Sequence, residues 1–341
     1  MIGVDRIATG CKALDALTDG GLPTGTITQI FGEKALGKSI LSLQAGFATV
    51  AGGNSAIILD TEQSYLSYLV PYRKDGFERR FGNGTEVKEL KLERVPRRQD
   101  KRSKQPITRS ELVTSLSGSL SKLGIAYTES HLSAIANILS PEFHVELDGK
   151  DPSVMILQMP DIIEMLALHG SETEKVVSEG GRVELRLRST PTYQSALRQI
   201  IEQTHAKLLV YDSLSAPFKS TFPNTQDLPA RSAGLAMLLS HAQRLCVEFG
   251  IAVVVTSHAS IDPIKAWDRR PYGGITLGHE AKFSFELTKS NAKRSKEEEP
   301  AVKINPEDER AAGRAIWVQR HPALADYSRV GYANIDEEGF H

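Results

Sequence analysis

The sequence GEKALGKS, from Gly32 to Ser39, decides the fold of this chain. It matches the pattern GxxxxGK[ST], in which glycines let the backbone N–H groups of a loop surround phosphate groups. Residues 27–31 (ITQIF) have the composition of a β-strand, and residues 38–50 carry apolar side chains at helical spacing until Gly52 ends the pattern. A strand, a glycine-rich turn and a helix in this order are typical of a phosphate-binding loop at the start of a parallel α/β sheet.

The match predicts which side chains bind a nucleotide. Lys38 is expected to reach the β- and γ-phosphate oxygens, and Ser39 offers a hydroxyl to Mg²⁺. The alternative is a chance match in a glycine-rich turn, and both flanking elements argue against it. We therefore expect ATP and Mg²⁺ as cofactors and ATP hydrolysis as the activity. The residues expected around the nucleotide are Gly32, Glu33, Lys34, Ala35, Leu36, Gly37, Lys38, Ser39 and Ile40.

Two apolar runs end in carboxylates that complete such a site. Residues 208–211 (LLVY) precede Asp212, and residues 56–59 (AIIL) lead into Asp-Thr-Glu at 60–62. Asp212 is predicted to orient the Mg²⁺-bound water, as a metal-site and catalytic residue. Glu62 is predicted to act as the general base that activates the attacking water. Taken alone, Asp212 also suits a helix or turn cap, and Glu62 a solvated loop carboxylate.

Composition excludes several classes of protein. The chain has 341 residues, a formal net charge of −1 and 40% hydrophobic residues, so any nucleic-acid surface must be a local patch. No run approaches the roughly 18 apolar residues of a membrane span, and the N-terminus lacks the pattern of a signal peptide, so a cytoplasmic location is expected. Cys11 and Cys246 have no CxxC or histidine cluster nearby, which predicts buried thiols rather than a disulfide or zinc site.

The length allows one large α/β domain, or a core of about 200 residues with a second small module. Strand and helix patterns resume after about residue 190. A helix is expected from residue 228, with Asp227 as its cap, until Gly250 ends it. Further helical spacing covers residues 196–204, and strands are expected at residues 251–256, 283–287, 315–318 and 327–335.

Residues 83–181 are too long and too structured for a simple connector. Residues 94–104 contain six basic residues and one acidic residue, which is typical of a flexible cationic linker. Apolar spacing then predicts helices at residues 110–123, 130–139 and 162–168, while residues 144–147 and 183–187 alternate like strands. We therefore expect a first core part at 1–82, a small α+β insertion at 83–181 and a second core part at 182–341.

The ordered motifs resemble a known family. Residues 9–15 (TGCKALD), residues 20–22 (GGL), the phosphate loop and residues 60–62 (DTE) are similar to the ATPase core of the RecA superfamily, most closely its archaeal RadA and RadB branch. Residues 228–256 and 271–279 resemble the second half of that core. The resemblance implies an α/β fold with a RecA-like core, in which helices flank a mostly parallel central sheet, and it leaves the insertion outside.

The resemblance also implies a function: a DNA-dependent or DNA-regulated ATPase of homologous recombination and repair, acting as a recombinase paralogue or accessory factor. The partners that the resemblance implies are DNA, with single-stranded DNA preferred, and either further copies of this chain or a recombinase. It supports Lys38 and Ser39 as phosphate and Mg²⁺ ligands, Glu62 as base and Asp212 at the metal. Arg320 and Pro322 would belong to a cap over ATP bound to a neighbouring subunit.

Two loops would face DNA if the family pattern holds, at about residues 217–231 and 259–274. Basic side chains there would bind phosphates, and a tryptophan would stack on an unpaired base. Solvated loop charge is the alternative for any one of these residues. The candidates are Lys219 and Arg231 in the first loop, and Lys265, Trp267, Arg269 and Arg270 in the second.

Three departures from the family pattern bear on function. The chain starts close to the ATPase core, so we expect neither the helix-hairpin-helix N-terminal domain nor the linker that hooks one subunit to the next. His258 stands where these recombinases carry a glutamine that senses the γ-phosphate. It can donate a hydrogen bond to phosphate and titrate near neutral pH, or be a structural strand-end histidine. The insertion separates Glu62 from Asp212, where the family has a shorter connection.

These departures predict an accessory factor that does not build long filaments alone. Two alternatives stay open on the sequence. One is a KaiC-like regulatory ATPase whose insertion binds a protein partner and which does not bind DNA. The other is a nucleotide-dependent scaffold that does not hydrolyse ATP.

Overall fold

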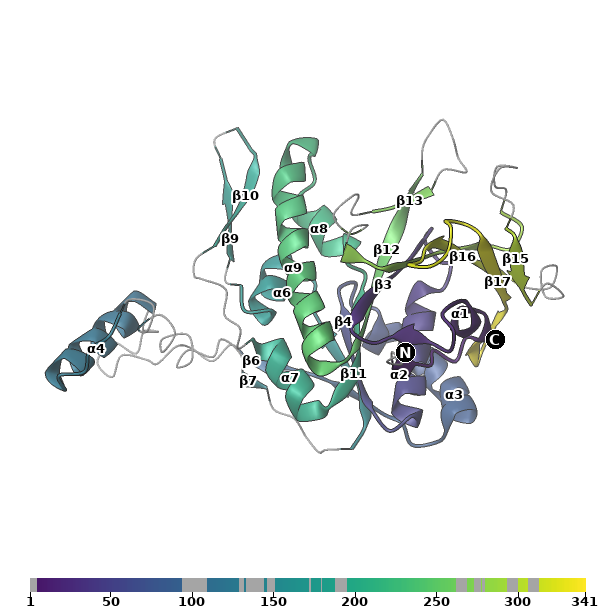
Figure 1. Cartoon of the computed structure of the whole chain (residues 1–341), viewed down its shortest axis with the longest axis horizontal. Helices are drawn as coiled ribbons and strands as arrows, with labels where there is room; N and C mark the ends of the chain where they lie inside the picture. Colours follow the sequence, from purple (N-terminus) through teal and green to yellow (C-terminus); the bar gives the residue numbers. More distant parts are fainter. Residues whose placement is uncertain are drawn as a thin grey trace.

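The structure is a computed structural model that describes residues 5–93, 109–128, 132, 144–145, 151–171, 173–178, 180–187, 195–261, 269–272, 277, 280–292, 300–305 and 313–341. Figure 1 shows a twisted central sheet with helices on both faces, and helix α4 (Arg109–Lys122) set apart from this body. Within the described residues, eleven strands form this sheet, in the order β15-β17-β16-β14-β3-β12-β11-β4-β8-β5, with β13 paired to β12. In that part of the chain no helix is long and apolar enough to cross a membrane.

The middle of the sheet is parallel, as the sequence predicts. Parallel pairing joins β14 to β3, β3 to β12, β12 to β11, β11 to β4, β4 to β8 and β8 to β5. These strands are β3 (Thr26–Gly32), β4 (Ser55–Asp60), β5 (Glu86–Glu89), β8 (Ser153–Gln158), β11 (Ala206–Asp212), β12 (Ala252–Ile261) and β14 (Phe283–Lys289). Antiparallel pairs extend one side through β16 (Arg314–Arg320) and β17 (Arg329–Ala333), and β15 (Val302–Ile304) lies at its edge. The expected mostly parallel α/β sheet is therefore confirmed.

Helices cover both faces because the central strands bury side chains on both. In β4, Ile57 and Leu59 enter one hydrophobic core, while Ala56 and Ile58 enter the other, as the two-residue period of a strand requires. The first core is completed by α6 (Ile162–Leu168), α7 (Ala196–Thr204), α8 (Ser215–Thr221) and α9 (Leu228–Phe249). The second is completed by α1 (Lys12–Leu17), α2 (Lys38–Ala51) and α3 (Val70–Phe81).

The central sheet includes part of the segment predicted as an insertion. Strand β8 lies between β4 and β5, and the α6 residues Ile162, Met165 and Leu166 are fully buried in the first core. The run SVMILQ at β8 is short and apolar, so periodicity alone does not assign it to a strand or a helix. The separate part of the segment is therefore smaller than residues 83–181, and the three domain boundaries stay a prediction.

Outside the central sheet, this segment forms α4, the pair β6 (Leu92–Glu93) and β7 (His144–Val145), and the start of a hairpin of β9 (Thr173–Val177) and β10 (Val183–Leu187). The helices predicted at 110–123 and 162–168 and the strands at 144–147 and 183–187 are found as α4, α6, β7 and β10. The cationic linker at 94–104 and nearly all of the helix predicted at 130–139 lie outside the described residues.

Helix α9 begins at Leu228 with Asp227 in the N-cap position, as the sequence predicts, but the Asp227 side chain makes no cap bond to α9. Asp227 also ends a 3₁₀ turn (Thr225–Asp227). The buried carboxylate instead accepts a hydrogen bond from the Val183 backbone N–H at 2.9 Å, which fastens the β9–β10 hairpin to α9. The other end of α9 is as expected, since Gly250 has φ 56° and stops the helix.

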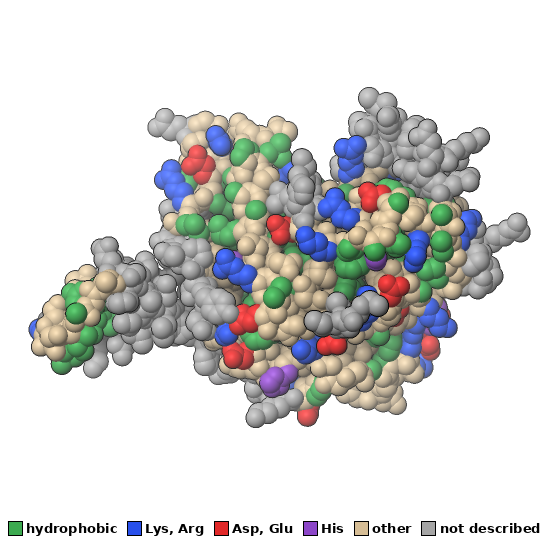
Figure 2. Space-filling view, viewed as in Figure 1, with side chains coloured by type: hydrophobic (Ala, Val, Ile, Leu, Met, Phe, Trp, Pro, Cys, Tyr) green, Lys and Arg blue, Asp and Glu red, His purple; other side chains and the backbone are tan. Residues whose placement is uncertain are grey.

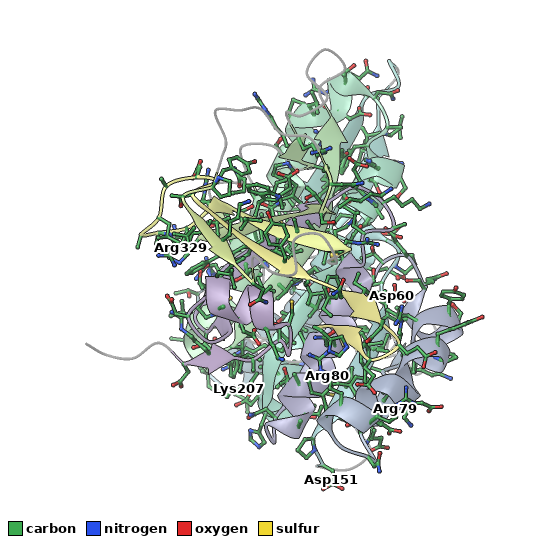
Figure 3. All side chains as sticks on the ribbon, turned by 90° about the vertical axis from the view of Figure 1, so that its right-hand side faces the viewer. Asp60, Arg79, Arg80, Asp151, Lys207 and Arg329 are labelled. Atoms are coloured by element: carbon green, nitrogen blue, oxygen red, sulfur yellow. The ribbon has the colours of Figure 1, made fainter. Side chains whose placement is uncertain are left out.

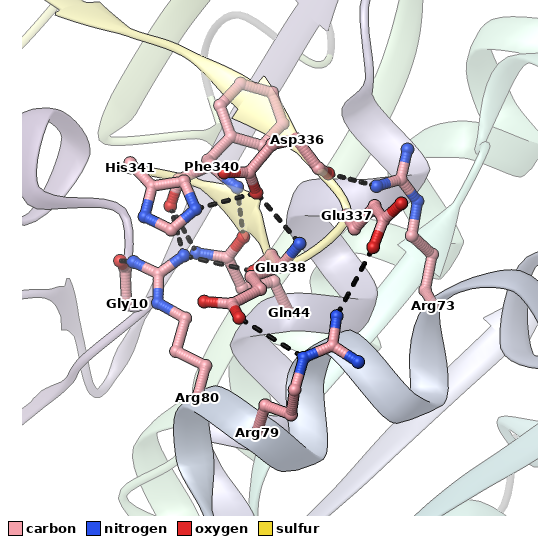
Figure 4. Close-up of polar contacts among 10 residues, drawn as sticks. All are labelled: Gly10, Gln44, Arg73, Arg79, Arg80, Asp336, Glu337, Glu338, Phe340 and His341. Carbon is pink, nitrogen blue, oxygen red and sulfur yellow. Dashed lines mark hydrogen bonds and ion pairs between the residues drawn. The ribbon is translucent and has the colours of Figure 1, made fainter.

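The C-terminal residues contact α2 and α3, and Arg80 of α3 links them to Gly10 near the N-terminus (Figure 4). Arg80 donates hydrogen bonds to the backbone oxygens of Gly10, Glu338 and Phe340. Gln44 accepts from the Phe340 N–H at 2.6 Å and donates to the Phe340 carbonyl at 3.1 Å. Figure 3 shows Arg80 beside the C-terminal ribbon. Since the Phe340 ring is also fully buried, this segment forms a fixed wall on that side of the molecule.

Candidate nucleotide-binding site

A pocket with a volume of about 940 Å³ lies where four parallel strands end. The strands are β3, β4, β11 and β12, and ligands of open α/β sheets bind at this carboxyl edge. From the predicted phosphate loop, the pocket lining includes Lys34, Ala35, Gly37, Lys38, Ser39 and Ile40. Gly32, Glu33 and Leu36 do not line it. Leu36 is 4% exposed and packs in the core beneath the loop.

The loop backbone needs glycine at its turn into α2. Gly37 has φ 101°, and a Cβ there would lie 2.9 Å from the Ile335 side chain and 3.0 Å from the Phe340 ring. A side chain at this position would therefore collide with the C-terminal wall as well as strain the backbone. Because α2 begins at Lys38, its N-terminal N–H groups face the pocket and favour an anion there.

Lys38 is held inside the loop. Its Nζ donates to the carbonyl oxygens of Gly32 at 3.0 Å and Glu33 at 2.7 Å. Burial lowers the pKa of Lys38, and the nearby carboxylates of Asp212 and Glu62 oppose this shift. A cation in this position, beside two carboxylates and a helix N-terminus, is suited to bind phosphate oxygens.

Asp212 occupies a buried, hydrogen-bonded position at the end of β11. It is 4% exposed, accepts a hydrogen bond from the Tyr65 hydroxyl at 2.5 Å, and accepts another from the Thr256 hydroxyl. Burial and the charge of Asp212 raise the pKa of Tyr65 well above its usual range, so the phenol stays a donor. The roles of Tyr65 and Thr256 were not predicted from the sequence. No local signal was available, because Tyr65 and Asp212 are 147 residues apart.

Glu62 lies opposite, at the end of β4, and shares the pocket with Lys38, Ser39, Asp212 and His258. Its Oε1 accepts from the Ser213 hydroxyl at 3.1 Å and lies 3.4 Å from His258 Nε2. The hydrogen bond from His258 lowers the pKa of Glu62, aided by Ser213 and opposed by partial burial. The structure therefore brings together all five polar residues predicted for hydrolysis.

Removing His258 is expected to shift the acid limb of the pH–activity profile. Because His258 holds the pKa of Glu62 below its usual range, a reaction that needs the carboxylate is active above that pKa and fails as pH falls through it. In His258→Ala, the pKa of Glu62 rises, so activity should be lost at a higher pH. His258→Gln keeps a donor and should shift the limb less. The check is kcat/KM for ATP across the acidic range, and an unmoved limb in His258→Ala would contradict the contact.

The outer wall of the pocket was not predicted from the sequence. Tyr68 and Tyr72 are 62% and 71% exposed, and their ring centroids are 4.8 Å apart. Both line the pocket on one side, and Ile335, Asp336 and Glu337 of the C-terminal wall line it too. Exposed aromatic rings beside a phosphate loop offer a surface on which a planar base can stack. Spacing does not reveal this role, because aromatic residues at helical spacing are equally typical of a core.

The predicted first DNA-facing segment is largely helical rather than a loop. Residues 217–231 contain most of α8, the 3₁₀ turn and the start of α9. Lys219 Nζ lies 4.6 Å from the centroid of the Tyr272 ring, and Arg231 donates to the Tyr272 hydroxyl at 2.8 Å. Lys219 and Arg231, both predicted to bind DNA, therefore contact the same aromatic residue, Tyr272 of the second segment.

The second segment is partly described. Strand β12 continues past His258 to Ile261 and pairs antiparallel with β13 (Arg269–Pro271). Arg270 is exposed, whereas the Arg269 side chain is only 12% exposed and bonds to Glu33. Lys265 and Trp267 lie outside the described residues. On the face seen in Figure 2, the described Lys and Arg side chains are interspersed with acidic ones and form no continuous patch.

Arg320 and Pro322 do not line this pocket. Arg320 ends β16, opposite Ser284 of β14, and Pro322 follows in a turn. His321 between them packs edge-on against Phe283 at 4.9 Å. A role over ATP on a neighbouring subunit stays a prediction.

The residues present fit Mg²⁺ bound together with phosphates. In the described part of the chain, no group of three or more His, Cys, Asp or Glu side chains is arranged to hold a metal ion. Mg²⁺ in nucleotide sites uses only one or two protein oxygens in addition to phosphate, and Ser39 and Asp212 both face the pocket. Cys11 and Cys246 are free and buried, and burial raises the pKa of each thiol to about 12.

Known proteins share both the sequence pattern and the fold. The Rad51 family model matches residues 3–73 and 189–310, more than half of the chain. "DNA repair and recombination protein RadB" of Methanoculleus marisnigri is 53% identical over 58 residues, 17% of this chain and 26% of that protein. "DNA repair protein Rad51 homolog" of Drosophila melanogaster is 24% identical over 296 residues, 84% of this chain and 61% of that protein. The chain thus spans less than two thirds of these relatives.

A solved structure agrees with the fold. The crystal structure of the RadB recombinase superposes with a TM-score of 0.50 at 18% identity and covers 98% of both chains. The family model matches the two parts that carry Lys38, Ser39, Glu62, Asp212 and His258, and it does not cover residues 74–188 between them. Because it matches both halves of the nucleotide-binding core, in order and on the expected fold, the chain belongs to the Rad51 family of the RecA superfamily.

Proposed function

We propose that this protein is an ATP-hydrolysing member of its family that acts on DNA in recombination and repair, as a recombinase paralogue or accessory factor. The observation that carries the proposal is the convergence of Lys38, Ser39, Glu62 and Asp212 on one pocket. A phosphate-binding cation, two candidate metal ligands and a carboxylate base are the groups that ATP hydrolysis requires.

Each of these side chains has a task in the proposed reaction. Lys38 and the first N–H groups of α2 bind the phosphate oxygens, and Ser39 and Asp212 would hold Mg²⁺, which neutralises phosphate charge when bound. Glu62, kept ionised by His258 and Ser213, accepts the proton of the attacking water. Tyr65 fixes the Asp212 carboxylate through its hydrogen bond. Tyr68 and Tyr72 offer the stacking surface for the base.

DNA as the partner is supported by the relatives and by one structural link. Both curated relatives are named for DNA repair. Strand β12 runs without interruption from Thr256, which bonds to Asp212, through His258 into the predicted DNA-facing segment. A partner bound near Lys219, Arg231 and Arg270 would therefore act on the strand that borders the nucleotide. We propose single-stranded DNA, and self-association or association with a recombinase. The regulatory-ATPase alternative has no support among these relatives.

The test is ATP hydrolysis with and without single-stranded DNA, together with DNA binding at several salt concentrations. We expect DNA to raise the hydrolysis rate several-fold. Arg231→Gln and Arg270→Gln should each lower the slope of log affinity against log salt by about one, because each removes one phosphate contact. If DNA does not change the hydrolysis rate and the protein shows no salt-dependent DNA binding, the proposed action on DNA is rejected. No phosphate release under any condition would favour a scaffold.

A further inference from the structure

Three charged residues connect the phosphate loop, β13 and β14. Arg269 Nε donates to Glu33 Oε1 at 2.9 Å, and Arg269 Nη1 lies 3.7 Å from Glu286 Oε1. The side chain of Arg269 is 12% exposed, that of Glu286 is fully buried, and that of Glu33 is 45% exposed. One arginine thus joins the segment predicted to face DNA, the phosphate loop and the central strand β14.

This environment does not suit a nucleic-acid contact. Phosphate binding relies on a guanidinium that meets the anion at the surface. The Arg269 side chain is instead largely buried and lies between two carboxylates, so a phosphate approaching it would meet their negative charge and would have to displace an existing pair. Arg270, the next residue of the same strand, is exposed, as expected from the alternation of side chains along a strand.

The contact reaches the nucleotide site through Glu33. The Glu33 side chain accepts from Arg269, while its carbonyl oxygen accepts from Lys38 Nζ at 2.7 Å. On the other side, β13 is fastened to β12 by the pairs Ile261–Arg269 and Ala259–Pro271. A displacement of this hairpin would therefore move Arg269, and through it the peptide that positions the Lys38 ammonium.

We propose that Arg269 is a positioning residue of the phosphate loop, which transmits the position of the paired strand residues 259–261 and 269–271 to Glu33 and Lys38, and that it is not a DNA contact. The inference rests on the proposed nucleotide site. It does not require that the protein bind DNA.

A double-mutant cycle on ATP affinity tests the link. Glu33→Met removes the acceptor at similar size and leaves the pair of Arg269 with Glu286 in place. Arg269→Met removes the arginine, so its thermal unfolding is measured in parallel, and Arg269→Lys adds a variant that keeps the charge but not the forked geometry. Arg244→Met, at an exposed arginine of α9, is the control.

Glu33→Met and Arg269→Met should each weaken ATP binding by about 5- to 20-fold, within the usual range of coupling between sites. The double variant should be no weaker than Arg269→Met alone, because both changes break one link. Arg269→Lys should recover only part of the affinity, and Arg244→Met should match the wild type. If the two effects instead multiply, or Glu33→Met binds ATP normally, Arg269 does not act through Glu33 and the proposal fails.

A second measurement separates this role from DNA binding. Arg269→Met should leave the salt dependence of single-stranded DNA binding unchanged, whereas Arg270→Met should lower its slope by about one. An equal drop in Arg269→Met would identify Arg269 as a phosphate contact and overturn the proposal. If the wild-type protein binds no DNA, the proposed function fails while the cycle on ATP affinity still decides the role of Arg269.

Discussion

Glu62→Gln should bind ATP as tightly as the wild type and hydrolyse it about 10²–10⁴-fold more slowly, the usual contribution of a positioned general base. The amide has nearly the same shape and can still meet the Ser213 hydroxyl, which bonds to Glu62 at 3.1 Å. It has no basic oxygen for the proton of the attacking water. This variant should therefore keep ATP binding and lose proton transfer from the attacking water.

The measurements are ATP affinity by equilibrium binding and phosphate release in single turnovers. Glu202→Gln, which alters an exposed carboxylate on α7, is the control and should change neither quantity. Hydrolysis at the normal rate in Glu62→Gln would show that another group accepts the proton. Asp60 is a poor substitute, because its oxygens already accept the N–H groups of Glu62 and Tyr65.

Lys38→Ala should weaken ATP binding by about 10²–10⁴-fold, since it removes two charge-assisted hydrogen bonds of about 1.5–3 kcal/mol each. The Lys38 side chain is buried and faces the phosphate-binding end of the pocket. Its loss also leaves Asp212 and Glu62 without the cation that faces them, so the empty site becomes more repulsive to an anion.

Equilibrium binding of ATP, with thermal unfolding in parallel, checks this result. The unfolding curve shows whether the variant keeps its fold without the lysine's bonds to Gly32 and Glu33. A folded Lys38→Ala protein that binds ATP within a few-fold of the wild type would contradict the assignment. Together with Glu62→Gln, this variant distinguishes the group that holds phosphate from the group that activates water.

Which residues meet in the pocket was largely predictable, because the main motifs of the proposed nucleotide site are contiguous. A phosphate loop needs glycine where the backbone turns, a lysine and a serine at the start of a helix, and a strand before them, and these needs appear within one short segment. The carboxylates Glu62 and Asp212 were predictable for a similar reason, because each follows an apolar run and parallel strands end at a common edge. The buried helices 162–168 and 196–204 were found from apolar spacing alone.

Other features depend on residues that meet only when the sheet is assembled. Tyr65 and Asp212 are 147 residues apart, Glu33 and Arg269 are 236 apart, and Gln44 and Phe340 are 296 apart. The placement of β11 between β4 and β12 brings the first pair together, and no periodicity along the chain encodes it. The low exposure of Arg269 could likewise not be predicted from the sequence. Two adjacent arginines are typical of a solvated loop, and only the pairing of β13 with β12 places the Arg269 side chain beside Glu33 and Glu286.

The fold class, the phosphate loop and the two strand-end carboxylates could therefore be predicted from the sequence, because each depends on residues that are neighbours along the chain. Sheet order and packing determined the rest: which hydroxyls hold Asp212, which arginine braces the phosphate loop, and how the C-terminal segment closes the pocket. They also placed β8 and β5 of the predicted insertion in the central sheet. The physical reason is that a turn or a helix start is specified by neighbouring residues, whereas a buried ion pair or a shared wall is specified by the free energy of the whole assembled core.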